Sequence, residues 1–380
     1  MHVLAAFNAW KGSLSSARAN AAALKGVARA FPKAELASVP VADGGDGTLE
    51  ALVEGLGGFT ARVRTVDPLG RPMRALLGYV DGGKTAVIEM ARASGLALLA
   101  PEERNPLHTS TYGTGLLLRY AVKNGAQKIL LGIGGSATND AGMGLAAALG
   151  WKFYDRAGEP VKPSGGGLLD LARIERPARP EFDLSKIEIR VACDVVNPLY
   201  GPRGAAHVFA AQKGAVGHMV DALDRGLRHF SRVVRRDLGV TLDRLEGGGA
   251  AGGLGAGLVA FFGAHLVRGV DLVFEAAGVE EAVKRADLVL TGEGAVDGQT
   301  AEGKAPSGVA VLAKRHGKPC VLLTGNVRGD LSRLHEMGVT SVFAVAPGPC
   351  TLSDSMKNGG AWLSDSAEHA VRLWAGRHPG

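Results

Sequence analysis

The chain has 380 residues, of which 46% are hydrophobic, so it can bury a large core, and its length favours two domains over one. The formal net charge of +6 is modest, and lysine and arginine are scattered without basic blocks, which argues against a nucleic-acid partner. No apolar run approaches the ~20 residues that span a bilayer, and the N-terminus lacks the pattern of a secretion signal. The cysteines are far apart and outside metal-ligand spacing, which favours a reducing compartment; they are Cys193, Cys320 and Cys350. We therefore expect a cytoplasmic globular protein with no membrane partner.

Glycine is the outlier in the composition. The chain contains 56 glycines, and they gather at apparent strand ends without a fixed period. Because glycine lets the backbone turn sharply and approach a ligand closely, this pattern predicts loops that face a ligand.

The N-terminal part alternates strands and helices. The pattern predicts a strand over 2–7, a helix over 17–30, a strand over 36–41 and a helix that ends near residue 56. Three short strands follow within 59–89, and such a change to strands alone is typical of a domain boundary. After a helix over 113–124, the stretch KILLGIGGSATNDAGMGLAAALG (128–150) predicts a strand over 129–133, a glycine-rich loop and a helix over 142–149.

The same alternation returns at the C-terminus. Between the two alternating parts we predict strands over 151–154 and 187–192, a long amphipathic helix over 216–237 and a glycine-rich helix up to about residue 262. The final part predicts strands over 287–290, 320–323 and 341–345, with helices over 305–315 and 331–337. We therefore predict an α/β fold in which residues 1–64 and 285–380 form one Rossmann-like domain with a parallel sheet. Residues 65–284 form a second α/β domain inserted in it, and the cleft between the domains is the expected place for a ligand.

Acidic and basic side chains collect where predicted strands end. Phosphoryl transfer needs carboxylates that hold Mg²⁺, cations and backbone N–H groups around the phosphates, and a group that orients the attacking hydroxyl. The candidate carboxylates are Asp43, Asp46, Asp194, Glu293 and Asp297, the cations are Lys11, Lys213 and Lys304, and the loop from Gly134 to Asp140 offers amides and hydroxyls. The structural alternative for each aspartate is a helix N-cap or an Asx-turn.

Other motifs are incomplete. Gly298 to Lys304 has the spacing G-x-x-x-x-G-K, but Ala305 stands where a P-loop has the Ser or Thr that binds magnesium, so this is not a Walker motif, although we expect Lys304 to meet a phosphate. Gly255, Gly257 and Ala260 fit the dinucleotide fingerprint, but no predicted strand precedes them. The sequence has neither a G-x-S-x-G elbow nor an H-E-x-x-H pair.

Seven blocks of this sequence together resemble one family, the type I glycerate kinases. They are VADGGDGTLEALVEGLGG (41–58), ASGLALLAPEERNPLHTSTYGTG (93–115), GIGGSATNDAGMGLAAALG (132–150), ACDVVNPLYGPRGAAHVF (192–209), QKGA (212–215), GGGAAGGLGAG (247–257) and TGEGAVDGQTAEGKAPSGVA (291–310). The resemblance implies two α/β domains with the active site between them, and phosphorylation of glycerate with ATP and magnesium. It leaves open a homodimer.

The resemblance also indicates which positions form the site. We assign Asp194 to the substrate hydroxyl or the metal, and Lys213 and Lys304 to phosphate. Asp46 and Asp297 are further candidates for the metal, and Asp43 and Glu293 for metal, ribose or substrate hydroxyls. The remaining predicted substrate- or phosphate-binding residues are Lys11, Gly134, Gly135, Ser136, Thr138, Asn139 and Asp140.

Several positions depart from the family pattern. The chain has Asn8 and Ala9 before Trp10 and Lys11, where the family commonly reads A-P-D-S-[FY]-K. Ala210 and Ala211 replace a usual G-P, and Ala295 stands where an arginine is common. The expected activity is ATP- and Mg²⁺-dependent phosphorylation of D-glycerate to 2-phosphoglycerate. The alternatives are the 3-phosphate product or another small hydroxy acid, and a nucleotide- or sugar-acid-binding protein without turnover.

Overall fold

The computed structural model describes residues 1–45, 47–178 and 180–376, without the side chains of residues 299 and 302. The chain forms two compact units. Unit 1 consists of Met1–Asp43, Glu50–Gly58 and Val273–Gly380, and unit 2 of Gly44–Leu49 and Phe59–Leu272. The predicted α/β fold with an inserted second part is therefore present. The predicted domain boundaries fall somewhat later in the sequence, at 64/65 and 284/285, and independent domains with those bounds stay a prediction.

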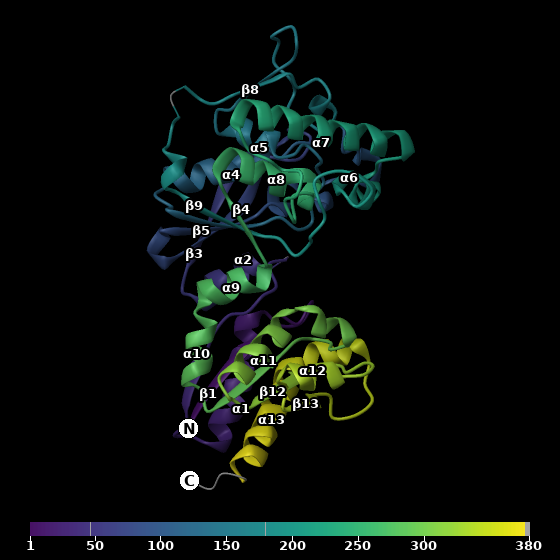
Figure 1. Ribbon diagram of the computed structural model, residues 1–380. Coiled ribbons are helices and arrows are strands. Elements are labelled where there is room, and N and C mark those ends of the chain that lie inside the picture. Colours follow the sequence, from purple (N-terminus) through teal and green to yellow (C-terminus); the bar gives the residue numbers. More distant parts are fainter. Residues whose placement is uncertain (46, 179, 377–380) are drawn as a thin grey trace. The chain divides into compact units, whose positions relative to one another are not determined.

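A five-stranded parallel sheet lies at the centre of unit 1 (Figure 1). Its strands are β1 (His2–Phe7), β2 (Glu35–Ser38), β11 (Leu288–Gly292), β12 (Cys320–Thr324) and β13 (Ser341–Ala344), in the order β13-β12-β11-β1-β2. Val3 to Phe7 are completely buried, as expected of a central parallel strand with both faces covered. Leu4 pairs with Val289, so the N- and C-terminal segments share one sheet, as the sequence predicts.

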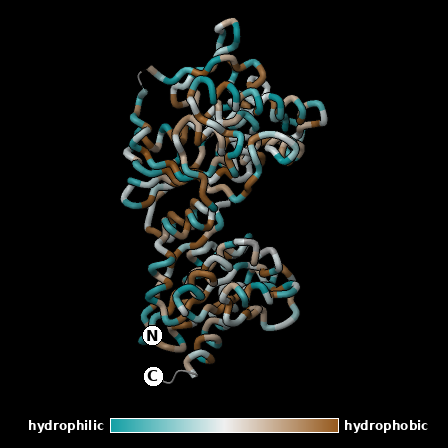
Figure 2. The backbone as a smooth tube through the Cα atoms, in the orientation of Figure 1, coloured by the Kyte–Doolittle hydropathy of each residue, from teal (hydrophilic) through white to brown (hydrophobic). Residues whose placement is uncertain are grey.

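Helices cover both faces of this sheet. On one face α1 (Ser16–Ala30) packs against α13 (Leu352–Ala375), and both contribute to the core with Val3, Ala5 and Phe7. The helices α10 (Val279–Arg285), α11 (Ala305–Arg315) and α12 (Ser332–Met337) complete unit 1, and α10 and α11 contact β1. Two further helices, α2 (Thr48–Gly55) and α9 (Gly269–Ala277), belong partly to each unit, because the chain passes from one unit to the other within them. Figure 2 colours the backbone by hydropathy and shows hydrophobic and hydrophilic segments alternating along the chain in both units.

The strand order of unit 1 creates a topological switch point. Within the sheet, β2 is the neighbour of β1 on one edge and β11 is its neighbour on the opposite edge. In open α/β sheets ligands bind outside the carboxyl ends of the strands, at the point where the order reverses. The loops that follow β1 and β11, residues 8–15 and 293–304, therefore lie where a ligand is expected.

Unit 2 is built on a six-stranded mixed sheet. Its strands are β3 (Phe59–Val66), β4 (Pro72–Val80), β5 (Thr85–Glu89), β6 (Lys128–Gly132), β9 (Glu188–Ala192) and β10 (His265–Val267), in the order β10-β9-β6-β5-β4-β3. The pairs β3–β4 and β4–β5 are antiparallel, and the other pairs are parallel. The carboxyl ends of β5, β6 and β9 therefore point the same way, and the loops that follow them meet at one edge.

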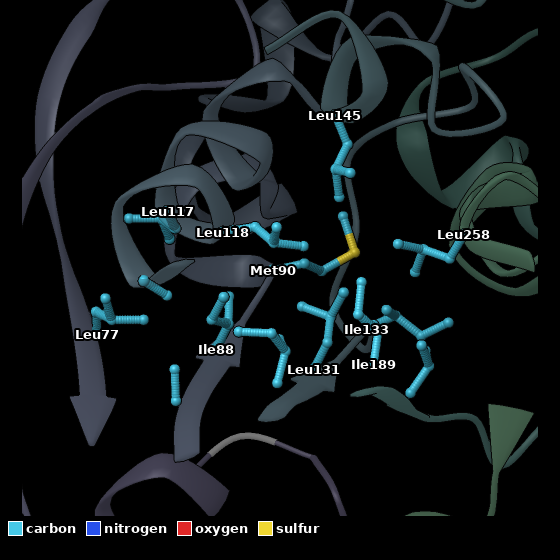
Figure 3. Packing of buried hydrophobic residues seen from close by; sticks show 14 of the residues in the cluster. Leu77, Ile88, Met90, Leu117, Leu118, Leu131, Ile133, Leu145, Ile189 and Leu258 are labelled. Atoms are coloured by element: carbon cyan, nitrogen blue, oxygen red, sulfur yellow. The ribbon is translucent and has the colours of Figure 1, made fainter. Parts of the chain in front are cut away.

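Two hydrophobic clusters hold unit 2 together. Figure 3 shows the first, which contains Ile88, Leu131 and Ile189 from the sheet together with Leu117 and Leu258 from two helices. The second cluster contains Trp151, Phe153 and Phe261, and the ring centroids of Phe261 lie 5.0 Å from Trp151 and 5.8 Å from Phe153. The helices of unit 2 are α3 (Ala91–Ser94), α4 (Tyr112–Lys123), α5 (Met143–Ala148), α6 (Ala205–Phe209), α7 (Gly217–Leu238) and α8 (Ala250–Phe262), and β7 (Lys152–Tyr154) pairs with β8 (Arg173–Glu175).

The start of α8 is not regular helix. Ala251, Gly252 and Gly253 have left-handed φ values of 52°, 69° and 87°. A Cβ on Gly252 would lie 2.1 Å from the carbonyl oxygen of Thr138, so this contact requires glycine. The carbonyl of Gly252 accepts a 3.1 Å hydrogen bond from the N–H of Ala141, itself in the left-handed region at φ 49°. The glycine-rich run therefore docks directly onto the loop that follows β6.

No helix in residues 1–45, 47–178 and 180–376 has the length and hydropathy required to span a bilayer.

Candidate active site

A cavity of about 360 Å³ opens in unit 2 at the carboxyl ends of β6 and β9. Predicted and unpredicted residues share its wall. They are Gly44, Gly45, Leu96, Ile133, Gly134, Gly135, Ser136, Ala192, Cys193, Asp194, Val195, Phe209, Gln212, Lys213, Ala250 and Ala251. Five predicted site residues are thus brought together here: Gly134, Gly135, Ser136, Asp194 and Lys213.

The loop that carries Ser136 is fixed by its neighbours. The carbonyl of Gly135 accepts a hydrogen bond from the N–H of Leu96 at 2.8 Å, and the N–H of Ala137 donates to the carbonyl of Ser94 at 2.9 Å. The hydroxyl of Thr109 donates to the carbonyl of Ala137 at 2.9 Å. The Ser136 side chain therefore comes from a braced segment of backbone.

Lys213 lies in the wall of this cavity and is 1% exposed. Its Nζ donates to Ser136 Oγ at 2.8 Å and to the carbonyl of Thr138 at 2.7 Å. Burial lowers the pKa of Lys213 to about 7, although the charge of Asp140 acts in the opposite direction. The side chain is therefore close to the point where it loses its charge near neutral pH.

Asp140 is completely buried behind the loop and does not line the cavity. Its carboxylate accepts hydrogen bonds from the N–H and hydroxyl of Thr111 at 2.8 and 2.9 Å, and from the N–H groups of Gly142 and Gly144 at 3.1 Å each. Burial raises the pKa of Asp140, and these hydrogen bonds oppose the rise. Asp140 thus fixes the loop by joining Thr111 to Gly142 and Gly144. Its contact with a ligand stays a prediction.

Thr138 and Asn139 are also completely buried and lie outside the cavity lining. Within the described residues, the hydroxyl of Thr138 and both polar atoms of the Asn139 amide form no hydrogen bond. Buried polar side chains are nearly always paired, so these two residues are unusual within unit 2. Their role as binding residues stays a prediction.

Asp194 follows β9 and is exposed at the cavity wall. Its Oδ1 accepts a 2.8 Å hydrogen bond from the N–H of Gly269, the first residue of α9. The aspartate therefore combines a cavity position with a hydrogen bond to the N-terminus of a helix that begins 75 residues later in the chain. Asp46 is also predicted to bind metal, and it lies outside the described residues.

One residue of this region is missing from the sequence prediction. Glu89 ends β5, is 5% exposed, and accepts hydrogen bonds at 3.0 Å each from the N–H groups of Gly47 and Leu49. The Nε of Arg92 donates to the same carboxylate at 2.8 Å. Glu89 thus holds the loop that brings Gly44 and Gly45 to the cavity. The sequence signal that could have identified Glu89 is a carboxylate at the end of a predicted buried strand.

A second group of predicted residues lies in unit 1, after β11. Glu293 Oε1 accepts a 2.8 Å hydrogen bond from the hydroxyl of Thr300 and forms an ion pair with Lys304 Nζ at 3.9 Å. Burial raises the pKa of Glu293, and the nearby charges of Asp43 and Asp297 raise it further, against the effect of Lys304. Glu293 therefore interacts electrostatically with two other predicted carboxylates and with one predicted cation.

Lys304 occupies the N-cap position of α11, after a 3₁₀ turn over Gly298–Glu302. This geometry agrees with the absence of a Walker motif, because β11 ends at Gly292, well before Gly298, and a 3₁₀ turn separates that glycine from α11. Lys11, in the loop after β1, is exposed, whereas Trp10 beside it is 4% exposed.

The departures from the family pattern have separate surroundings. Asn8 accepts a hydrogen bond from the N–H of Ala9 at 2.8 Å, so its side chain takes part in a local turn. Ala210 is completely buried among the second cluster, while Ala211 and Ala295 are exposed. Their effects on activity are not explained by these contacts.

Within the described residues, no group of three or more histidine, cysteine, aspartate or glutamate side chains is arranged to hold a metal ion.

Comparison with known proteins decides the family. The sequence pattern of the Glycerate kinase family matches residues 3–375. The chain belongs to the glycerate kinase family. Members of this family are phosphotransferases, and the chain is accordingly an enzyme of that class. Glycerate kinase from Bacillus subtilis (strain 168) is 42% identical over 97% of this chain and 96% of its own length.

Two further relatives of this glycerate kinase family member are informative. A protein named glycerate 2-kinase from Escherichia coli (strain K12) is 42% identical over 94% of this chain and 93% of its own length. A crystal structure described as a "putative glycerate kinase 2" from Salmonella typhimurium LT2 superposes with a TM-score of 0.91, at 42% identity, and covers 99% of both chains. The predicted fold class and family are therefore confirmed.

Proposed function

We propose that this protein phosphorylates D-glycerate at the 2-hydroxyl with ATP and Mg²⁺, giving 2-phosphoglycerate and ADP. The observation that carries the proposal is the near full-length similarity to a relative named glycerate 2-kinase. A cytoplasmic location and small-molecule substrates belong to the same proposal, as does a possible homodimer.

The carboxylates of unit 1 fit a role in binding magnesium. Glu293 has its pKa raised partly by Asp43 and Asp297, so negative charge is concentrated there and a divalent cation would relieve it. Mg²⁺ usually keeps several waters and is held by one or two carboxylates together with substrate phosphates, so a cage of three protein ligands is not required. When bound, the ion would neutralise charge on the phosphate oxygens.

The side chains of the two units supply the remaining tasks. Lys304 would contact a phosphate oxygen of the nucleotide, and Lys11, in the loop after β1, would add a second cation. In unit 2 Asp194 would orient the substrate hydroxyl, and Gly134 and Gly135 would let the backbone approach the substrate closely. The arrangement of both sets of residues around one reaction, as the sequence predicts, stays a prediction.

The proposal is tested by measuring ADP release with D-glycerate, ATP and Mg²⁺, followed by phosphorus NMR of the product. We expect turnover that requires all three components and a 2-phosphate product. A 3-phosphate product would contradict the assigned hydroxyl. Turnover with a different small hydroxy acid alone would contradict the assigned substrate.

The same preparation tests the alternative class. Calorimetry with ATP and with glycerate reports binding without chemistry. Tight binding of either ligand combined with no product would show a binding protein that lacks turnover.

A further inference from the structure

Ser136 and Lys213 form a hydrogen-bonded pair in the wall of the unit 2 cavity. Lys213 Nζ lies 2.8 Å from Ser136 Oγ, and both residues line the cavity. Ser136 is 9% exposed and Lys213 1%. The serine hydroxyl is therefore the more accessible end of the pair, with the amine behind it.

The surroundings of Lys213 do not suit a permanent cation. Within the described residues Lys213 forms no ion pair, and its two partners are a neutral hydroxyl and a neutral carbonyl. The charge of Asp140 acts on the amine, but its oxygens accept their hydrogen bonds from Thr111, Gly142 and Gly144 and not from Lys213. Burying a charged amine without a paired carboxylate is strongly unfavourable.

A neutral amine satisfies the observed contacts. In that form Nζ has two N–H donors and one lone pair. One N–H would still donate to the carbonyl of Thr138 at 2.7 Å, and the lone pair would accept from the Ser136 hydroxyl across the 2.8 Å over which the ammonium form donates to Oγ. The pKa of Lys213, lowered by burial to about 7, agrees with this form at neutral pH.

We propose that Ser136 and Lys213 relay the proton of the substrate hydroxyl, with the Lys213 amine as the final acceptor. The inference deepens the proposed kinase reaction and rests on it. It also replaces the sequence-based assignment of Lys213 as a phosphate ligand with a role in proton transfer.

The proposed reaction transfers one phosphoryl group and one proton. The bond between the substrate oxygen and its hydrogen breaks as that oxygen forms a bond to the γ-phosphorus of ATP, and the γ-phosphorus bond to the bridging oxygen breaks, its electron pair leaving with ADP. The substrate proton passes to Ser136 Oγ while the serine proton passes to Lys213 Nζ, which becomes an ammonium. The ammonium later returns its proton to solvent.

Other titratable groups near Lys213 are placed less suitably. Asp140 is saturated and lies outside the cavity lining, and burial raises the pKa of the Cys193 thiol in the wall. Asp194 lies in the same wall but is exposed and caps α9. Arg104 presents its backbone carbonyl to Gly214, beside the lysine, and a guanidinium has no lone pair to accept a proton.

The experiment compares Lys213→Arg, Lys213→Met and Ser136→Ala with wild type across pH. A positioned general base contributes about 10²- to 10⁴-fold, and arginine keeps a cation but cannot accept a proton. We expect Lys213→Arg to lower kcat at least about 100-fold, with little change in KM for ATP, and to remove the wild-type rise in kcat/KM near pH 7. Ser136→Ala should lower kcat while leaving KM for ATP nearly unchanged.

Controls separate the relay from folding and from the proposed function. Lys162→Met, at another cavity of unit 2, should behave as wild type, and circular dichroism checks that each variant is folded. Lys213→Arg that keeps wild-type kcat and pH profile would overturn the relay and leave the kinase assignment intact. Ser136→Ala with unchanged kcat would overturn it independently, even if the lysine variants fail to fold. Wild-type protein without turnover on D-glycerate would overturn both.

Discussion

Replacing Glu89 by glutamine tests whether one buried carboxylate holds the loop between β2 and α2. Glu89 is 5% exposed and makes hydrogen bonds to Gly47 N, Leu49 N and Arg92 Nε. Glutamine has nearly the same shape but no charge. Its amide nitrogen would stand where a carboxylate oxygen now accepts from the arginine, so one donor would face another.

The magnitude follows from the three contacts. Hydrogen bonds to charged groups contribute about 1.5–3 kcal/mol, compared with about 1 kcal/mol for neutral pairs. Two bonds to backbone N–H groups are weakened and the bond to Arg92 is lost, and the arginine side chain is 35% exposed and can turn to water. We therefore expect Glu89→Gln to reduce the free energy of unfolding by about 2–4 kcal/mol.

Urea unfolding gives this free energy, and hydrogen exchange shows where it is lost. Exchange should rise first at the amides of Gly47 and Leu49. Glu188→Gln is the matched control, because that glutamate is half-exposed and its ion pair with Lys128 spans 3.4 Å, so its loss should matter by less than about 1 kcal/mol. If Glu89→Gln unfolds like wild type and both amides stay protected, Glu89 does not hold this loop.

Three further results are expected. Gly252→Ala should destabilise the protein by at least about 2 kcal/mol in urea unfolding, whereas Gly263→Ala, at a left-handed position with open space, should lose about 1 kcal/mol; equal losses would contradict the close contact at Gly252. The pKa of Lys213 is about 7 in the folded chain and 10.5 in its ordinary state, so the unfolded chain binds more protons between these values and wild-type stability should rise with pH across that window. Lys213→Met should lack this rise in urea titrations at several pH values, and an identical slope would show that the amine is not perturbed. Lys304→Met should raise KM for ATP about tenfold, a loss of about 1.4 kcal/mol, because the proposed phosphate contact and the ion pair with Glu293 are removed; an unchanged KM would exclude the phosphate contact.

Much of the fold follows from local patterns in the sequence. The strand over 2–7 and the helix over 305–315 have their predicted bounds, because a continuous apolar run and a proline in the first helical turn are strong signals. The predicted strand over 36–41 ends instead at Ser38. Pro40 lacks an N–H for the ladder, and this edge strand pairs only with β1.

The candidate site was only partly predictable. The carboxyl-end rule locates Ser136 and Asp194. It does not distinguish them from Asp140, which has the same sequence context but is enclosed by donors from α4 and α5. Lys213 lines the same cavity but follows α6 and not a strand, so its predicted place at a strand end is wrong, and only the QKGA block of the family resemblance indicated it. Glu89 was missed because its partners at 47 and 49 lie some forty residues earlier, and no local pattern shows such a pairing.

The pairing of β1 with β11 has a consequence for biosynthesis. The hydroxyl of Thr291 donates to the carbonyl of Ala6, 285 residues away. At about 5–20 residues per second the ribosome needs on the order of 15 to 60 s to make the intervening chain. During that interval Val3 to Phe7 can pair with β2 but lack β11 on their other edge, and an apolar strand with an open edge favours aggregation.

Unit 2 meets no such delay, because nearly all of it lies within Phe59–Leu272 and is complete before β11 emerges. We therefore expect the inserted unit 2 to fold first during synthesis. The N-terminal strand β1 pairs with β11 only when the last quarter of the chain is made. A stalled nascent chain from which residues up to 287 have emerged from the ribosome should protect the unit 2 core from protease while its N-terminal segment remains open to cleavage.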